Sequence, residues 1–263
     1  MYKILFSLLI LSQATLACAM DIPEVVRSCM AKNMPESTSV QAIEMRARDR
    51  GGYESIMQAD VYWKRVKDAP AKVLMYMHEP SDVRGARFLI IQNEPQNDMY
   101  IYMPSLFKVR KITARNISNS MLGTDFSYED FERLQGVMTD MKAEQRPDEV
   151  LDGRPVYVIN SYPGDNSGYE EIISYIDIET CVTLKTELLE KGGQLRKLLT
   201  VKPETIRQTG GIHVPMEVLI KDIRDKTKTT IVINKIRVEV PLEDDLFDPT
   251  QLKKKKAPPI TTE

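Results

Sequence analysis

The chain has 263 residues and carries 36 Lys and Arg against 38 Asp and Glu, a formal net charge of -2 at pH 7. This balance excludes a clearly basic domain of the kind that binds nucleic acid through its phosphates. The length suits one large β domain or two small ones.

The first predicted element is a secretory signal peptide at residues 1–19. Lys3 precedes the apolar run ILFSLLIL, and Ala17, Cys18 and Ala19 end the segment with an A-x-A pattern. A charged start, a short apolar core and such a site are typical of signal peptides. The run is shorter than the about 20 apolar residues that span a bilayer. We expect cleavage after Ala19; the alternative is a lipoprotein acylated at Cys18, although Thr15 stands where that motif places a leucine.

Two cysteines remain in the mature chain, Cys29 and Cys181. In an oxidising compartment two such cysteines are expected to form a disulfide. The alternative is a pair of separate buried thiols.

The first mature element is a helix over residues 22–34, in which Pro23 suits the first turn and apolar residues recur at helical spacing. The period then changes to two. Five strand-like runs are predicted up to Ile112, followed by a helical and loop region from Ser118 to about Arg146. Six more strand-like runs follow, at residues 155–163, 169–179, 182–191, 195–208, 213–223 and 228–239.

About eleven strands are therefore expected, and their connections are too short for crossover helices, so neighbouring strands should be antiparallel. A flat open sheet of this size is unusual because accumulated twist curls it. The fold class is mainly β (α+β): one strongly curved antiparallel sheet with an N-terminal helix and a helical insertion.

One face of this sheet is rich in methionine and aliphatic residues at alternating positions. Such a face is typical of a lipid-binding cavity and also of an ordinary filled core. Methionine suits an adaptable lining. The candidate lining residues are Met57, Val61, Trp63, Val73, Met75, Met77 and Phe88.

The densest acid cluster, Asp125, Glu129 and Asp130, lies in the stretch MLGTDFSYEDF. It does not match a calcium loop, which needs a central glycine and a distal glutamate. It matches a helix start: Ser127 as N-cap with Asp130 three residues later forms a capping box. Phe126 and Phe131 have the spacing of a hydrophobic staple. We expect Asp125 to bind backbone groups or a basic residue of the segment 108–115, fastening this helix to the sheet.

No arrangement of residues predicts catalysis, a metal site or a cofactor. The two histidines, His78 and His213, lack a ligand-spaced partner, and the zinc spacings H-E-x-x-H and C-x-x-C are absent. The G-x-S-x-G elbow of hydrolases is absent as well. We therefore expect a protein that is not an enzyme.

Two basic runs stand out, FKVRKITAR at residues 107–115 and KKKK at residues 253–256. One interpretation is a solvated strand edge and a frayed tail. The other is a surface that meets anionic lipid head groups or an acidic partner.

Three motifs in this order, EPSDVRGARFLI, DMYIYMPSLFKVRKI and MLGTDFSYEDFERL, resemble those of the outer-membrane lipoprotein-sorting (LolA-like) proteins of Gram-negative bacteria. The branch encoded beside lipid exporters of the RND type is the most similar, and DDLFDPTQL at residues 244–252 fits the end of that family. The resemblance covers nearly the whole mature chain. No ligand-binding position of the family can be matched residue by residue.

The resemblance implies an incomplete antiparallel β-barrel of about eleven strands with a helical lid, which would include residues 127–134. Independently of the resemblance, no linker divides the chain, so we expect one domain over residues 20–250 with a flexible basic tail at 251–263. The resemblance also implies a periplasmic carrier of lipid or lipoprotein acyl chains that works with an RND-type inner-membrane permease, and we expect this carrier to be a monomer. A lipid-sensing or regulatory module on the same fold is the alternative function.

Overall fold

The computed structural model describes residues 22–34, 37–137 and 142–254. The expected signal peptide with Cys18, and Lys255 and Lys256 of the basic tail, lie outside the described residues.

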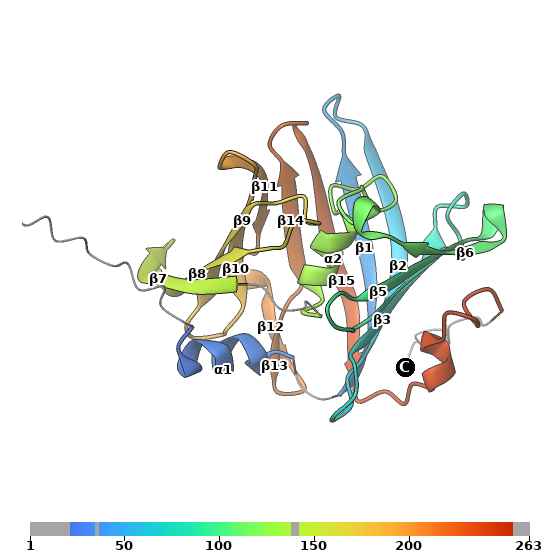
Figure 1. Cartoon of the computed structure of the whole chain (residues 1–263), viewed down its shortest axis with the longest axis horizontal. Helices are drawn as coiled ribbons and strands as arrows, with labels where there is room; N and C mark the ends of the chain where they lie inside the picture. Colours follow the sequence, from blue (N-terminus) through green and yellow to red (C-terminus); the bar gives the residue numbers. More distant parts are fainter. Residues whose placement is uncertain (1–21, 35–36, 138–141, 255–263) are drawn as a thin grey trace, which may run out of the picture.

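One antiparallel sheet of thirteen strands dominates the described residues, in the order β6-β5-β4-β3-β2-β1-β15-β14-β11-β10-β9-β8-β7, with a separate hairpin of β12 and β13. The sheet is curved but not closed, since β6 and β7 are its two edges (Figure 1). The strands are β1 (Thr38–Arg48), β2 (Glu54–Lys64), β3 (Lys72–Glu79), β4 (Arg87–Ile91), β5 (Asp98–Met103), β6 (Lys108–Ile112), β7 (Lys142–Leu151), β8 (Arg154–Tyr162), β9 (Glu171–Asp177), β10 (Thr183–Glu190), β11 (Gln194–Thr200), β12 (Ile206–Thr209), β13 (Ile212–Pro215), β14 (Glu217–Asp222) and β15 (Thr227–Val238).

The mainly β, antiparallel and curved character matches the expectation, whereas the strand count differs. Three of the predicted runs each contain two strands: residues 98–112 hold β5 and β6, 195–208 hold β11 and β12, and 213–223 hold β13 and β14. The first residues of β7, up to Arg146, lie in the segment predicted as helix and loop, and the rest of β7 lies where no element is predicted. The sequence does not predict β7 as a strand because its residues lack the apolar alternation of a half-buried strand. It is a polar edge strand interrupted at Pro147, where its register with β8 shifts.

The two faces of the sheet carry separate apolar cores. In β2, Met57 and Val61 belong to the core on the concave face, whereas Tyr62 points to the convex face and packs with Leu74 of β3. The convex core is covered by the C-terminal segment, through Leu242, Leu246, Phe247 and Leu252. Figure 1 shows this segment on the side of β3 and β5 opposite to α2.

The C-terminal segment changes the expected domain boundary. Leu252 is buried in the convex core, so the packed part of the chain extends beyond residue 250. The basic residues Lys253 and Lys254 therefore follow directly on a packed side chain rather than standing in a free tail.

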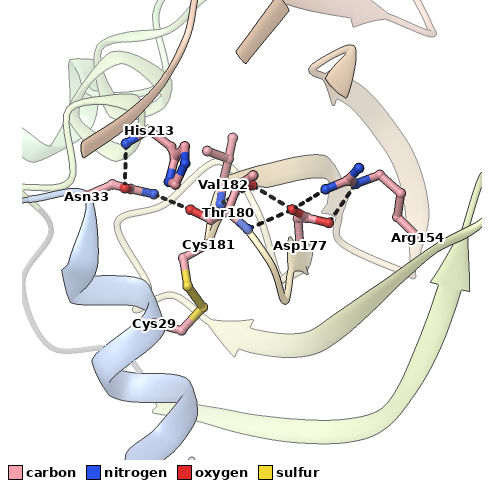
Figure 2. Close-up of a disulfide and its surroundings, with 8 residues drawn as sticks. All are labelled: Cys29, Asn33, Arg154, Asp177, Thr180, Cys181, Val182 and His213. Atoms are coloured by element: carbon pink, nitrogen blue, oxygen red, sulfur yellow. Dashed lines mark hydrogen bonds and ion pairs between the residues drawn. A yellow bond between two sulfur atoms is a disulfide. The ribbon is translucent and has the colours of Figure 1, made fainter. Parts of the chain in front are cut away.

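Helix α1 (Glu24–Lys32) is attached to the far end of the sheet by a disulfide. Cys29 is bonded to Cys181 in the β9–β10 turn, with 5.2 Å between their Cα atoms, so the two cysteines expected to pair are joined. Figure 2 shows Asn33 beside this bond: its side-chain amide donates to the Thr180 carbonyl (3.0 Å), and its oxygen accepts from the His213 backbone N–H (2.9 Å).

Helix α2 (Tyr128–Leu134) begins with the capping box that the sequence indicates. The Ser127 hydroxyl oxygen accepts from the Asp130 backbone N–H (3.1 Å), and the Asp130 carboxylate accepts from the Ser127 backbone N–H (2.8 Å). Phe126 and Phe131 are both fully buried in the concave core. The acid cluster is therefore the start of a helix that lies against the concave face.

Replacing both Cys29 and Cys181 with Ala should lower the free energy of unfolding by about 2–5 kcal/mol, because the bond restricts a long loop in the unfolded chain. The two bonded cysteines are separated by 152 residues in the sequence. Urea denaturation measures the effect. Reductant should destabilise the wild type by a similar amount and leave the double variant unchanged; an equal response of both would contradict the prediction.

Ser127→Ala should lower the free energy of unfolding by about 1 kcal/mol, since it removes one half of the capping box. Ser28→Ala, at an exposed position within α1, is the matched control and should have little effect because Ala is the better helix former. Equal midpoints for both variants in thermal or urea unfolding would rule out the cap as a stabilising feature.

Candidate functional site

A cavity of about 660 Å³ lies between the two helices and the concave face of the sheet. Its walls come from α1, α2, the first two strands, β8–β11 and β13–β15. Ligand cavities in proteins have volumes of about 300–1,000 Å³, so this space is large enough for a small organic ligand or part of a lipid.

The lining is mainly aliphatic, and several of its residues are partly exposed to the interior space rather than fully packed. Prominent members are Ile43, Val61, Leu134, Leu188, Leu199, Val218, Ile231 and Ile233. The charged residues of the lining are Arg27, Arg65, Asp130 and Arg133. Such a wall favours an apolar chain and offers a few charged groups to a polar end.

A β-bulge increases the apolar part of the wall. β15 pairs Ile233 with Ile43 and Lys235 with Ala42, so Asn234 is an extra residue on β15. A bulge shifts the side-chain alternation by one. Ile231 and Ile233 before it, and Ile236 and Val238 after it, therefore all line the cavity. Without the bulge, the alternation of side chains along β15 would place Ile236 and Val238 on the convex face.

Only Val61 and Trp63 of the seven candidate lining residues lie on the cavity wall. Met57, Val73, Met75, Met77 and Phe88 are buried in the concave core. This part of the core is filled because α2 lies on it: the Phe88 ring centroid is 5.1 Å from that of Tyr128 and 5.6 Å from that of Phe131. The cavity lies beside this filled region, toward α1.

Sequence reasoning missed most of the true wall, which comes from β8–β11 and β13–β15. The alternating apolar residues of these strands are visible in the sequence, for example Thr186 and Leu188 in β10. Alternation alone does not show which half of the sheet the helix covers.

Polar contacts fasten α2 to the sheet around one buried carboxylate. Besides the capping contact, Asp130 accepts from the Tyr169 hydroxyl (2.8 Å) and from Lys197 Nζ of β11 (2.7 Å). Burial, together with the neighbouring Asp130, raises the pKa of Tyr169, so its hydroxyl keeps its proton and donates. Because buried charges are costly unless paired, these donors are what allow Asp130 to lie inside.

Asp125 fastens the segment before α2, although not to the basic residues that were expected. Its carboxylate accepts from the hydroxyls of Thr227 and Thr229 on β15, and its backbone N–H donates to Thr229 (2.9 Å). Lys197 also donates to the Asp125 carbonyl (2.8 Å). Residues 108–112 form the edge strand β6, whereas β15 lies in the middle of the sheet, so the expected basic partner was wrong while the fastening role holds.

The two other carboxylates of α2 are buried and have raised pKa values. Burial raises the pKa of Glu129, which accepts from the Ser167 hydroxyl (2.7 Å) and the Gly168 N–H (3.0 Å). Burial also raises the pKa of Glu132 to about 7, although the Asn97 side-chain amide donates to it. Helix α2 thus holds charges that burial disfavours.

A second, polar cavity of about 640 Å³ lies on the other side of the ion pair between Asp130 and Lys197. Asp130 lines the apolar cavity and Lys197 lines the polar one, so their ion pair separates the two spaces. Most other charges of the polar cavity are paired with one another, for example Arg196 with Asp222 and Asp225.

The two histidines lie in different places, and only His78 contacts a carboxylate among the described residues. His78 Nε2 lies 2.7 Å from Asp60 Oδ2, and His213 lines the apolar cavity. Across residues 22–34, 37–137 and 142–254, no three His, Cys, Asp or Glu side chains are grouped to hold a metal ion. In the same ranges no helix has the length and apolar character needed to cross a bilayer.

A family model described only as that of an uncharacterized protein matches residues 70–254. No curated protein matches the sequence. Among solved structures, the chain is similar to an outer membrane lipoprotein-sorting protein domain from Vibrio parahaemolyticus, with 23% identity and a TM-score of 0.79, over 88% of this chain and 97% of that one.

Two further structures have the same fold. A DUF1329 family protein from Desulfovibrio piger is 23% identical, with a TM-score of 0.79, over 87% of this chain and 95% of that one. A LolA superfamily protein from Nitrosomonas europaea is 15% identical, with a TM-score of 0.66, over 85% of this chain and 96% of that one. The curved open sheet with its two helices is thus the LolA-like fold.

Glu132→Gln should make stability less dependent on pH. In the unfolded chain this carboxyl titrates near 4.5, whereas in the folded protein it titrates at about 7. The folded state binds more protons between these values, so the stability of the wild type falls as pH rises through this window. Between about pH 5 and pH 8 the wild type should lose about 1–3 kcal/mol relative to Glu132→Gln.

Urea midpoints at the two pH values measure this difference. Glu54→Gln, at an exposed position of β2, is the control and should follow the wild type. Parallel pH curves for wild type and Glu132→Gln would show that Glu132 is ionised in the folded protein throughout the range.

Proposed function

We propose that this chain, which has the fold of the LolA-like outer-membrane lipoprotein-sorting proteins, belongs to that family and is a periplasmic carrier of acylated ligands. The observation that carries this proposal is the apolar cavity of about 660 Å³ between the helices and the concave face. The ligand is a lipid or the acyl chains of a lipoprotein, and it travels between an inner-membrane permease of the RND type and the outer membrane.

The energetics of acyl chains require such a cavity. A chain of about 15 methylenes gains about 12 kcal/mol when it leaves water, at about 0.8 kcal/mol per methylene. A protein that holds this chain during transit must therefore offer an equally dry space. The aliphatic wall contributed by β10, β11, β14 and β15 meets this need.

A carrier must also open, and the two helices provide a suitable cover. Met34, just after α1, packs against Gly136, just after α2: a Cβ placed on Gly136 would lie 2.2 Å from the Met34 sulfur. The helices therefore meet above the cavity through a flexible methionine. The disulfide holds α1 in place. We therefore assign the entry of the ligand to a movement of α2 away from α1 that breaks the Met34–Gly136 contact.

Transfer without chemistry is part of this proposal, so the protein is not an enzyme. The carboxylates nearest the cavity are engaged in holding α2, as Asp130 is with Ser127, Tyr169 and Lys197. We assign them to the attachment of the cover. The carrier is proposed to act as a monomer.

Leu199→Trp should lower the affinity for a fluorescent fatty acid at least tenfold, because the larger ring occupies the cavity. Leu199 is a half-buried lining residue of β11. Leu195→Trp, at an exposed position of the same strand, is the matched control and should bind as the wild type does. Equal affinities of the three proteins would place the ligand elsewhere.

Native mass spectrometry with lipid extraction tests the proposed cargo in the purified protein. Stoichiometric acyl lipid is expected, and less of it with Leu199→Trp. Transfer of bound lipid to acceptor vesicles then distinguishes a carrier from a sensor, which binds without delivering. Consistent absence of bound lipid would refute the carrier proposal.

A further inference from the structure

The tip of the β5–β6 hairpin exposes two large apolar side chains to solvent. Leu106 is 49% exposed and Phe107 is 69% exposed. They end the short 3₁₀ turn η1 (Pro104–Leu106), after which Phe107 takes a left-handed backbone conformation with φ of 49°. That conformation is uncommon for a bulky residue and is usually left to glycine or asparagine. Neither side chain lines the apolar cavity.

Basic residues from two distant segments gather around this tip. Lys108 follows Phe107 at the start of β6, and Lys253 of the C-terminal segment lies with Nζ 6.0 Å from the Phe107 ring centroid. Lys254 comes next, and all three lysines are exposed. We call Leu106, Phe107, Lys108, Lys253 and Lys254 the Phe107 patch.

The cations of the patch form no ion pair with a carboxylate within the described part of the chain. Lys111, further along β6, is paired with Asp98, whereas no carboxylate pairs with Lys108, Lys253 or Lys254 there. The patch therefore presents three lysines without a direct ion pair beside an exposed aromatic ring.

Protection of a sheet edge explains only part of this arrangement. β6 is an edge strand, and charged residues on an edge prevent pairing with another sheet. That role accounts for Lys108. It does not account for two apolar side chains held out at the turn, nor for lysines brought to them from a segment about 145 residues away in sequence.

We propose that the Phe107 patch docks the protein on the surface of an anionic phospholipid bilayer. Aromatic rings settle at the level of the lipid head groups, and each lysine near an anionic surface adds to the attraction. An acidic protein partner is disfavoured because lysine is depleted in protein interfaces. The diffuse field of a membrane attracts lysine as well as arginine.

This docking site is separate from the cavity. It adds to the proposed transfer of acyl chains a step in which the protein binds the membrane surface. A carrier that exchanges an acyl chain with a membrane must bring its cavity close to the lipid surface. The patch lies at the β6 edge of the sheet, whereas the cavity lies on the concave face.

Sedimentation with vesicles tests the proposal with the purified protein. We expect binding to vesicles of phosphatidylcholine with about 30% phosphatidylglycerol, much weaker binding to pure phosphatidylcholine, and loss of binding at about 1 M salt, where charges are screened within about 3 Å. No binding to the anionic vesicles would overturn the proposal.

Two sets of variants locate the binding surface. Lys253→Gln with Lys254→Gln should weaken vesicle binding roughly thirtyfold, from about 1 kcal/mol per lysine, and Phe107→Ser about tenfold. The matched controls are Lys191→Gln with Lys221→Gln, two exposed lysines of other strands and turns, and Val150→Ser, an exposed apolar residue of β7. Equal effects of patch and control variants would overturn the proposal.

Leu199→Trp separates docking from ligand uptake. It should bind vesicles as the wild type does while taking up less fatty acid, so failure of the cavity and failure of the patch give different results. Circular dichroism checks that each variant is folded. If patch variants lose binding to an acidic protein while vesicle binding is absent in all proteins, the patch belongs to a protein interface instead.

Discussion

The concave face of the open sheet is the constraint on which the rest of the structure depends. Thirteen strands curve without closing, so the face keeps a continuous layer of aliphatic and methionine side chains that must be kept from water. Helix α2 fills the part over β2–β4, and α1 covers the far end. The space between these two covers is the apolar cavity.

The two covers are attached by different kinds of interaction, and this difference bears on function. A covalent bond and the Asn33 contacts hold α1 (Figure 2). Helix α2 has only seven residues, too few to be stable in isolation, and its attachment runs through buried charges such as Asp130 and Lys197. Helix α2 also buries Phe131 in the concave core, so its separation from the sheet would expose apolar as well as charged side chains to water.

The C-terminal segment has an analogous role on the convex face. Its leucines and Phe247 close a second core, and its last described residues reach the β5–β6 hairpin. The same packing that stabilises the sheet therefore also sets lysines beside Phe107. Cavity and patch lie on different parts of one sheet, so the proposed capture of an acyl chain and the proposed contact with a lipid surface do not use the same residues.

Local residue patterns were enough to predict the mainly β class, the antiparallel pairing, the helix start at Ser127 and the partnership of Cys29 with Cys181. Each of these follows from chemistry within a few residues, or from the number of cysteines. The division of the concave face into filled core and cavity did not follow, and five of the seven candidate lining residues proved to be core. The bulge at Asn234 and the threonine partners of Asp125 could not be predicted from these local patterns either. Alternation shows which side chains share a face, but which of them are covered depends on contacts between segments far apart in the chain, and those arise only when the sheet has curved and the helices have packed upon it.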